Sequence, residues 1–180
     1  AIGDDTSGVY RPMDVFVELA AEYVARGEDL VLSCYPEARE VRVLVEPAEK
    51  KGIKLIDSPV SGGKGGADSG TLTMMSAAKK AVLEEHRSVL DAVSKAVFHV
   101  GESIGQGQVV KAALQALIGA SFTAIFESLV LGTKAGADPE ILYEVFCSSG
   151  IGSSILKNCA ELILDRKFEN TGSHIGTMYK

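Results

Sequence analysis

Two stretches of this 180-residue chain combine residue types that could bind and transform a small acid. The first, residues 57–67, has the sequence DSPVSGGKGGA and follows an apolar run that predicts a β-strand. In parallel α/β sheets, ligands bind at the carboxyl ends of the strands. There Ser61, Gly62 and Gly63 would offer a hydroxyl and unshielded backbone N–H groups, a set that suits a carboxylate. A flexible solvent loop is the competing interpretation, because clustered glycines usually mark turns.

The second stretch, residues 105–111, has the sequence GQGQVVK and opens a long apolar segment. Lys111 and Gln115 are four residues apart, so a helix would place both on one face, which continues in apolar character through Phe122. Desolvation lowers the pKa of a lysine, and such an amine could exchange a proton with the reacting oxygen of a hydroxy acid. The alternative is a first-turn lysine whose amine reaches out to water.

Other polar residues predict no metal site and no thiol chemistry. The three histidines are far apart and lack the ligand spacing of a zinc site. The three cysteines form no CxxC pair and lie in apolar runs, which favours a reducing intracellular compartment. No Gly-x-Gly-x-x-Gly motif and no P-loop occurs in the sequence.

The composition and charge of the chain argue against nucleic-acid and membrane partners. Hydrophobic residues make up 46% and charged residues 23%, which is ordinary globular usage. The formal charge of -6 leaves no basic surplus for a phosphate backbone, so we expect no nucleic-acid partner. The longest uncharged stretch, residues 112–126, is shorter than the roughly 20 residues that cross a bilayer, so we expect a buried helix and no membrane partner.

The elements that must position the two stretches change character along the chain. Up to about residue 100, short apolar runs alternate with segments of helical period, which predicts an α/β domain with a partial Rossmann-type parallel sheet. The predicted helices are 12–26, 37–51 and 77–90, and the predicted strands are 30–34, 53–60, 71–75 and 96–100, with a glycine-rich loop at 62–70.

Beyond residue 104 the pattern predicts only helices: 109–135, 139–146 and 153–165, the second begun by an Asp138 N-cap and Pro139. We therefore predict two domains, residues 1–103 and 104–180. The long helix is apolar on almost every side and needs partners around it, which favours a homodimer or tetramer through the helical domain.

In this order and at this separation, the two stretches resemble the signatures of the β-hydroxyacid dehydrogenase family. Residues 57–63 are similar to the family's substrate-binding signature, and Gly105-x-Gly107-x-x-x-Lys111 to its catalytic signature. The resemblance implies an NAD(P)-dependent oxidoreductase of a small 3-hydroxy acid, with the C-terminal part of a Rossmann-like domain in residues 1–103. It implies a partial helical substrate and dimerisation domain of the 6-phosphogluconate dehydrogenase type in residues 104–180.

The resemblance also implies roles for single residues. Lys111 would move the hydroxyl proton, residues 61–63 would hold the substrate carboxylate, and Gln115 would touch the substrate where the family usually has Asn. That longer amide favours threonate-like acids over 3-hydroxyisobutyrate. Ser33 and Cys34 stand where the family commonly has Ser-Thr facing NAD or NADP, although a thiol is a poorer donor than a hydroxyl, and Lys180 matches a lysine near the cofactor.

The family's opening βαβ unit with its glycine fingerprint has no counterpart here, so we interpret the chain as an incomplete copy. We expect an intracellular, cytoplasmic protein, with organelle targeting left open. The alternative function is a cofactor-incompetent fragment that acts as a noncatalytic oligomerisation or binding module. An upstream strand followed by Gly-x-Gly-x-x-Gly would favour the enzyme.

Overall fold

The computed structural model describes residues 22, 25–32 and 38–169. The chain divides into two compact units, residues 1–112 and 113–180. Most of the predicted helix 12–26 lies outside the described residues. The two units meet inside a long helix, whereas the predicted domain boundary precedes that helix, at residue 103; the boundary between functional domains therefore stays a prediction.

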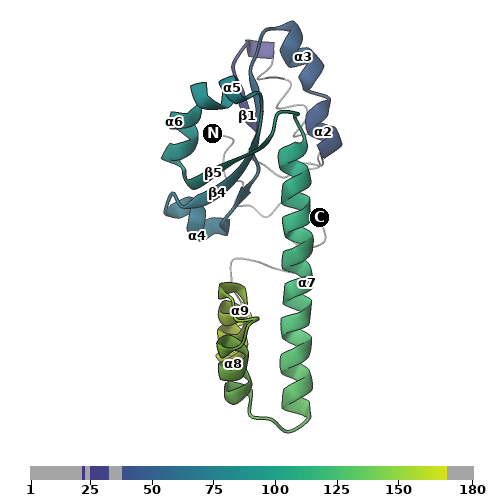
Figure 1. The fold of residues 1–180 in the computed structure, drawn as a ribbon, viewed down its shortest axis with the longest axis vertical. Coiled ribbons are helices and arrows are strands. Elements are labelled where there is room, and N and C mark those ends of the chain that lie inside the picture. The colour runs from purple at the N-terminus through teal and green to yellow at the C-terminus, as the bar shows by residue number, and fades with distance from the viewer. Residues whose placement is uncertain (1–21, 23–24, 33–37, 170–180) are drawn as a thin grey trace. The chain divides into compact units, whose positions relative to one another are not determined.

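The first unit is built on one mixed sheet (Figure 1). Strands β1 and β2 are parallel, β4 and β5 are parallel, and β4 is antiparallel to both β2 and β3. The pairs Asp57↔Ala77 and Ser61↔Thr73 share one register, so β2 and β3 are two halves of a single extended segment along β4. The strands are β1 (Leu30–Leu32), β2 (Leu55–Asp57), β3 (Val60–Ser61), β4 (Leu72–Ala77) and β5 (Ser94–Gly101).

The α/β class is confirmed, but the sheet is only partly parallel. Residues 62–71, which join β3 to β4, are fewer than the dozen or so that a parallel crossover needs, so the chain folds back antiparallel. The predicted loop at 62–70 is also wrong, because it contains the short helix α4 (Gly63–Asp68). Lys64 and Asp68 pair one turn apart in α4, and the Ser69 hydroxyl donates to the Gly65 carbonyl oxygen at 2.7 Å.

In the described part of the first unit, four further short helices accompany the sheet. The predicted helices 37–51 and 77–90 are each two short helices: α2 (Ala38–Arg42) with α3 (Val45–Lys50), and α5 (Lys80–Glu85) with α6 (Arg87–Ala92). Leu83 of α5 and Leu90 of α6 are buried with Ile56 of β2, so these helices close one core over the sheet. A second core joins Leu32 of β1 to α2.

The second unit is helical, as predicted. It contains most of α7 (Gln106–Lys134), α8 (Pro139–Ser148) and α9 (Ser154–Leu164). Asp138 caps α8 by accepting from Glu140 N and Ile141 N, and Ser153 caps α9. The buried core of this unit joins α7 to α9 through Ile125, Leu129, Leu156 and Ala160.

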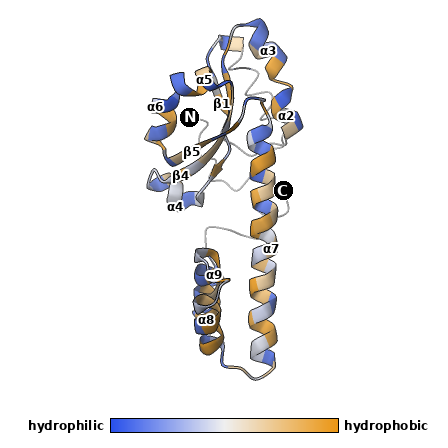
Figure 2. Cartoon of the chain, viewed as in Figure 1, coloured by the Kyte–Doolittle hydropathy of each residue, from blue (hydrophilic) through white to orange (hydrophobic). Residues whose placement is uncertain are grey.

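Apolar residues are distributed along the whole of α7 (Figure 2). By length and composition this helix, among the described residues, could cross a membrane. The predicted burial of residues 112–126 is wrong for this chain: Ile125 alone among them is buried, and the others are half-buried or exposed.

Candidate functional site

The turn after β3 holds the three residues predicted to bind a carboxylate. Ser61 ends β3 and is half-buried, while Gly62 and Gly63 are exposed at the start of α4. Gly62 has φ +137° and Gly63 φ +58°, conformations that favour glycine. A Cβ at Gly62 would lie 3.1 Å from a methyl of Leu72. The turn is therefore a defined strand-to-helix bend with its backbone accessible.

Lys111 lies in the second turn of α7 and is half-buried. Burial lowers the pKa of its amine, as the sequence predicts for a lysine beside apolar neighbours. Gln115 is also half-buried and lies one turn further along α7, on the same side of the helix. The helix therefore presents an amine and an amide in succession.

Asp57 ties the end of β2 to the first turn of α7. Its side chain is fully buried. One carboxylate oxygen, Oδ2, accepts from the backbone N–H of Gly105 at 2.9 Å and of Gln108 at 3.3 Å. The other, Oδ1, accepts from Gln108 Nε2 at 2.8 Å. The two stretches singled out in the sequence, 48 residues apart at Asp57 and Gly105, are thus joined by one side chain.

The environment of Asp57 acts on its charge in two opposing ways. Burial raises the pKa of this carboxyl, and the N–H donors of Gln108, Gly105 and Gly107 oppose that rise. Within the described part of the chain both oxygens accept from N–H groups, as an ionised carboxylate does. An acid at the first turn of a helix also meets the positive end of the helix dipole.

The glycines of the second stretch are required by close packing. A Cβ at Gly107 would lie 2.5 Å from Met75 O, 2.8 Å from Pro59 Cδ and 2.9 Å from Asp57 O. Gly105 has φ +96°, and a Cβ there would lie 2.7 Å from Arg42 Nε. Two of the atoms facing Gly107 are backbone oxygens of the sheet, so α7 begins in direct contact with β2 and β4.

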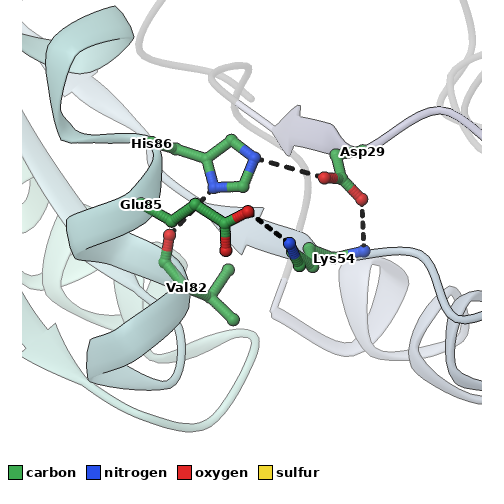
Figure 3. A network of polar contacts seen from close by, with 5 residues as sticks. All are labelled: Asp29, Lys54, Val82, Glu85 and His86. Atoms are coloured by element: carbon green, nitrogen blue, oxygen red, sulfur yellow. Dashed lines mark hydrogen bonds and ion pairs between the residues drawn. The ribbon is translucent and has the colours of Figure 1, made fainter.

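A separate polar network lies at the other end of β2 (Figure 3). Asp29 accepts from Lys54 N at 2.8 Å and lies 3.2 Å from His86 Nε2, while the Lys54 amine pairs with Glu85. His86 Nδ1 contacts the Val82 carbonyl oxygen at 2.9 Å. The network joins the starts of β1 and β2 to the end of α5, so we assign it to the stability of the sheet rather than to the candidate site.

The roles predicted from the sequence for Ser61, Gly62, Gly63, Lys111 and Gln115 stay predictions, and the sequence analysis overlooked the contact between Asp57 and Gln108. The signal for Asp57 is present: an acid in the apolar run IKLIDSPV must be buried, and a buried carboxylate must find donors. The identity of those donors depends on the fold. Ser33, Cys34 and Lys180, the residues predicted to meet the cofactor, lie outside the described residues.

The residues that the structure describes hold no cluster of three His, Cys, Asp or Glu side chains that could bind a metal. What they do hold is a glycine-containing turn, a half-buried lysine, and a buried acid that precedes the turn and binds the first turn of the lysine's helix. A Rossmann-type sheet followed by helices is a fold of proteins that bind dinucleotides.

Two known protein families match the sequence of the chain. Residues 11–101 match the family described as the NAD binding domain of 6-phosphogluconate dehydrogenase, and residues 105–180 match the family described as NAD-binding of NADP-dependent 3-hydroxyisobutyrate dehydrogenase. The chain belongs to the β-hydroxyacid dehydrogenase family, as its two signatures predict.

Individual relatives point the same way. The chain is 38% identical over 133 residues to 2-(hydroxymethyl)glutarate dehydrogenase of Eubacterium barkeri, which covers 74% of the chain and 42% of the relative. It is 30% identical to L-threonate dehydrogenase of Haemophilus influenzae, over 77% of the chain and 46% of the relative. The crystal structure of 3-hydroxyisobutyrate dehydrogenase from Salmonella typhimurium superposes with a TM-score of 0.69 at 26% identity, over 78% of this chain and 49% of that one.

A 3-hydroxyisobutyrate dehydrogenase of Mycobacterium tuberculosis, solved with L-serine, superposes with a TM-score of 0.74 at 26% identity, over 82% of this chain and 52% of that one. The chain spans about half the length of the curated relatives it matches.

Proposed function

We propose that the natural gene product containing this chain is an NAD(P)-dependent dehydrogenase of a small 3-hydroxy acid. The observation that carries the proposal is the Asp57 carboxylate, which binds the start of the Lys111 helix and lies four residues before Ser61. The proposed proton-transfer lysine and the proposed carboxylate-binding turn therefore lie on two segments that one buried side chain joins. The relatives described above are all dehydrogenases, which favours this function over a noncatalytic binding module.

In the proposed reaction, Lys111 accepts the hydroxyl proton during oxidation and returns it during reduction. A lowered pKa increases the fraction of neutral amine near neutral pH, and the neutral amine is the form that accepts a proton. The turn at 61–63 binds the substrate carboxylate through a hydroxyl and backbone N–H groups. A nicotinamide cofactor, when bound, supplies the hydride acceptor or donor for the carbon that bears the alcohol.

Residues 33, 34 and 180 are proposed to hold that cofactor on the strength of the family resemblance. Gln115 is proposed to determine which hydroxy acid the protein prefers. Its amide is one methylene longer than the asparagine usual in the family, so it would reach a different hydroxyl and favour a threonate-like acid. The predicted domains, 1–103 for the cofactor and 104–180 for substrate and assembly, form part of the same proposal.

The test is a substrate screen of the purified natural gene product. Threonate, erythronate, 3-hydroxyisobutyrate and glycerate are each supplied with NAD and with NADP, and the nicotinamide absorbance is followed. We expect turnover of at least one acid with one cofactor, and threonate above 3-hydroxyisobutyrate. A folded protein that turns over none of the eight pairs would contradict the proposed activity.

We also propose that the protein forms a homodimer or tetramer through its helical domain. On α7, Leu117 and Leu131 are 66% and 72% exposed, which is unusual for large apolar side chains on a long helix. Sedimentation at micromolar concentration should give a dimer or tetramer, and a strict monomer would contradict this. An intracellular location stays a prediction; one relative, from Dictyostelium discoideum, is named a mitochondrial enzyme.

A further inference from the structure

We propose that Asp57 and Gln108 are positioning residues: together they set the depth and rotation of the first turn of α7, and so the place of the Lys111 amine relative to the turn at residues 61–63. This inference rests on the proposed function, because it concerns the geometry of the proton-transfer step. Neither residue touches the substrate in this account. Each acts through Lys111.

The acid is itself fixed on the sheet. Asp57 pairs with Ala77 of β4, and the segment that follows is held by the hydrogen bond from Met75 N to Pro59 O at 2.9 Å. The residues that lead from Asp57 to Ser61 therefore have little freedom. A carboxylate held in this way is a fixed reference point for whatever binds it.

Besides the N–H of Gly107, three N–H groups attach the helix to that point at distances of 2.8 to 3.3 Å. Two are backbone donors, from Gly105 and Gln108, which fix the start of α7 along its axis. The third is the side-chain amide of Gln108, a residue only 2% exposed, which fixes the rotation of the helix. Lys111 follows Gln108 by three residues and so projects from the neighbouring part of the same helix surface.

The chemistry of the contact favours a positioning role. A buried carboxylate with an amide partner is costly to desolvate, and an apolar pair of similar volume holds a helix on a sheet as firmly or more so. An apolar pair does not fix the orientation of the helix. Hydrogen bonds do, because they weaken steeply when their distance or angle changes. The nearby Ser58–Ser76 hydroxyl pair, at 2.6 Å, ties β4 to the same segment and so helps to fix Asp57 on the sheet.

The experiment measures turnover of the natural gene product with its best acid and cofactor. Asp57→Asn keeps the size of the side chain but replaces an acceptor with a donor. We expect kcat to fall about 10- to 100-fold, because small displacements of a reacting group have effects of that size, while KM for the acid changes much less. Asp91→Asn is the matched control: the same substitution on α6, where Asp91 pairs with Arg87 at the surface. This surface variant should keep the wild-type kcat.

A double mutant separates positioning from general damage. If Asp57 acts through Lys111, Asp57→Asn should lower kcat no further once Lys111→Ala is present. A loss by the same factor in both backgrounds would overturn the proposal, as would wild-type kcat in Asp57→Asn. If Asp57→Asn does not fold, Gln108→Met tests the same claim, because it removes the side-chain donor and leaves the backbone donors in place.

Two variants distinguish the role of Lys111 from the positioning role of Asp57. Near-normal turnover by Lys111→Ala alone refutes the proposed role of the lysine, and the positioning claim falls with it. An inactive Lys111→Ala protein beside a fully active Asp57→Asn protein refutes only the positioning claim.

Discussion

Replacing Gly107 by alanine should detach the start of α7 from the sheet. The added methyl group would lie 2.5 Å from Met75 O, 2.8 Å from Pro59 Cδ and 2.9 Å from Asp57 O. Real Cβ atoms essentially never come within 3.0 Å of a neighbour, and two of these three atoms belong to paired backbone. The helix must therefore move, and its movement weakens the hydrogen bonds to Asp57.

The size of the effect follows from three contributions. Overpacking costs about 1–3 kcal/mol, and a buried acceptor left without its donors costs about 1–3 kcal/mol. Alanine gains up to about 1 kcal/mol over glycine in a helix, which opposes the other two. The free energy of unfolding should fall by about 1–5 kcal/mol.

The assay is urea denaturation of the natural gene product, with Gly65→Ala as the control. Gly65 lies in the interior of α4, and a Cβ added there would meet nothing within 4 Å, so alanine should be neutral or stabilising by up to about 1 kcal/mol. A Gly107→Ala protein as stable as the Gly65→Ala protein would refute the argument that the Gly-x-Gly spacing is imposed by contact with the sheet.

Three further predictions concern other parts of the fold. Arg166 follows α9 with φ 53°, a conformation that favours glycine. Replacing it by glycine should raise the free energy of unfolding by about 0.5–1 kcal/mol, measured by urea denaturation, and a decrease would contradict this. Asp29→Asn should flatten the acid end of the stability profile: the backbone N–H of Lys54 lowers the pKa of Asp29, so its stabilisation is present above 3.8 and is lost as pH falls through the lowered value. An unchanged acid limb would argue against it. The hydrogen bond to Glu161 raises the pKa of Tyr143 to about 12, so Glu161→Gln should shift the alkaline phenolate titration down toward 10.0, and an unmoved midpoint would contradict that cause.

Local rules in the sequence were sufficient for most of the fold. The alternation of short apolar runs with helical segments predicted the α/β unit, and the Asp138-Pro139 pair predicted where α8 begins. These signals act within a few residues, so they are visible in a linear sequence. The antiparallel β4 was missed because the direction of a strand depends on the length of its connection and on which neighbour it finds.

Some residues of the candidate site could likewise be predicted from local sequence, and others could not. Lys111 and the turn at 61–63 stand out because a charge in an apolar run and a cluster of glycines are local anomalies. The partnership of Asp57 with Gly105 and Gln108 spans about 50 residues and exists only once α7 docks on the sheet. The position of Asp57 in an apolar run predicts that it is buried and needs donors, but only the folded structure identifies those donors.

The central claim, that Lys111 transfers the proton in oxidation of a 3-hydroxy acid, is tested most directly by the turnover of one variant. The natural gene product carrying Lys111→Ala is assayed with the best acid and cofactor from the substrate screen, beside the wild type and the Asp91→Asn control. General acid–base groups contribute about 10²- to 10⁴-fold to rate, so kcat should fall by at least about 100-fold, while the protein stays folded and still binds cofactor. A kcat within a few-fold of the wild type would contradict the account.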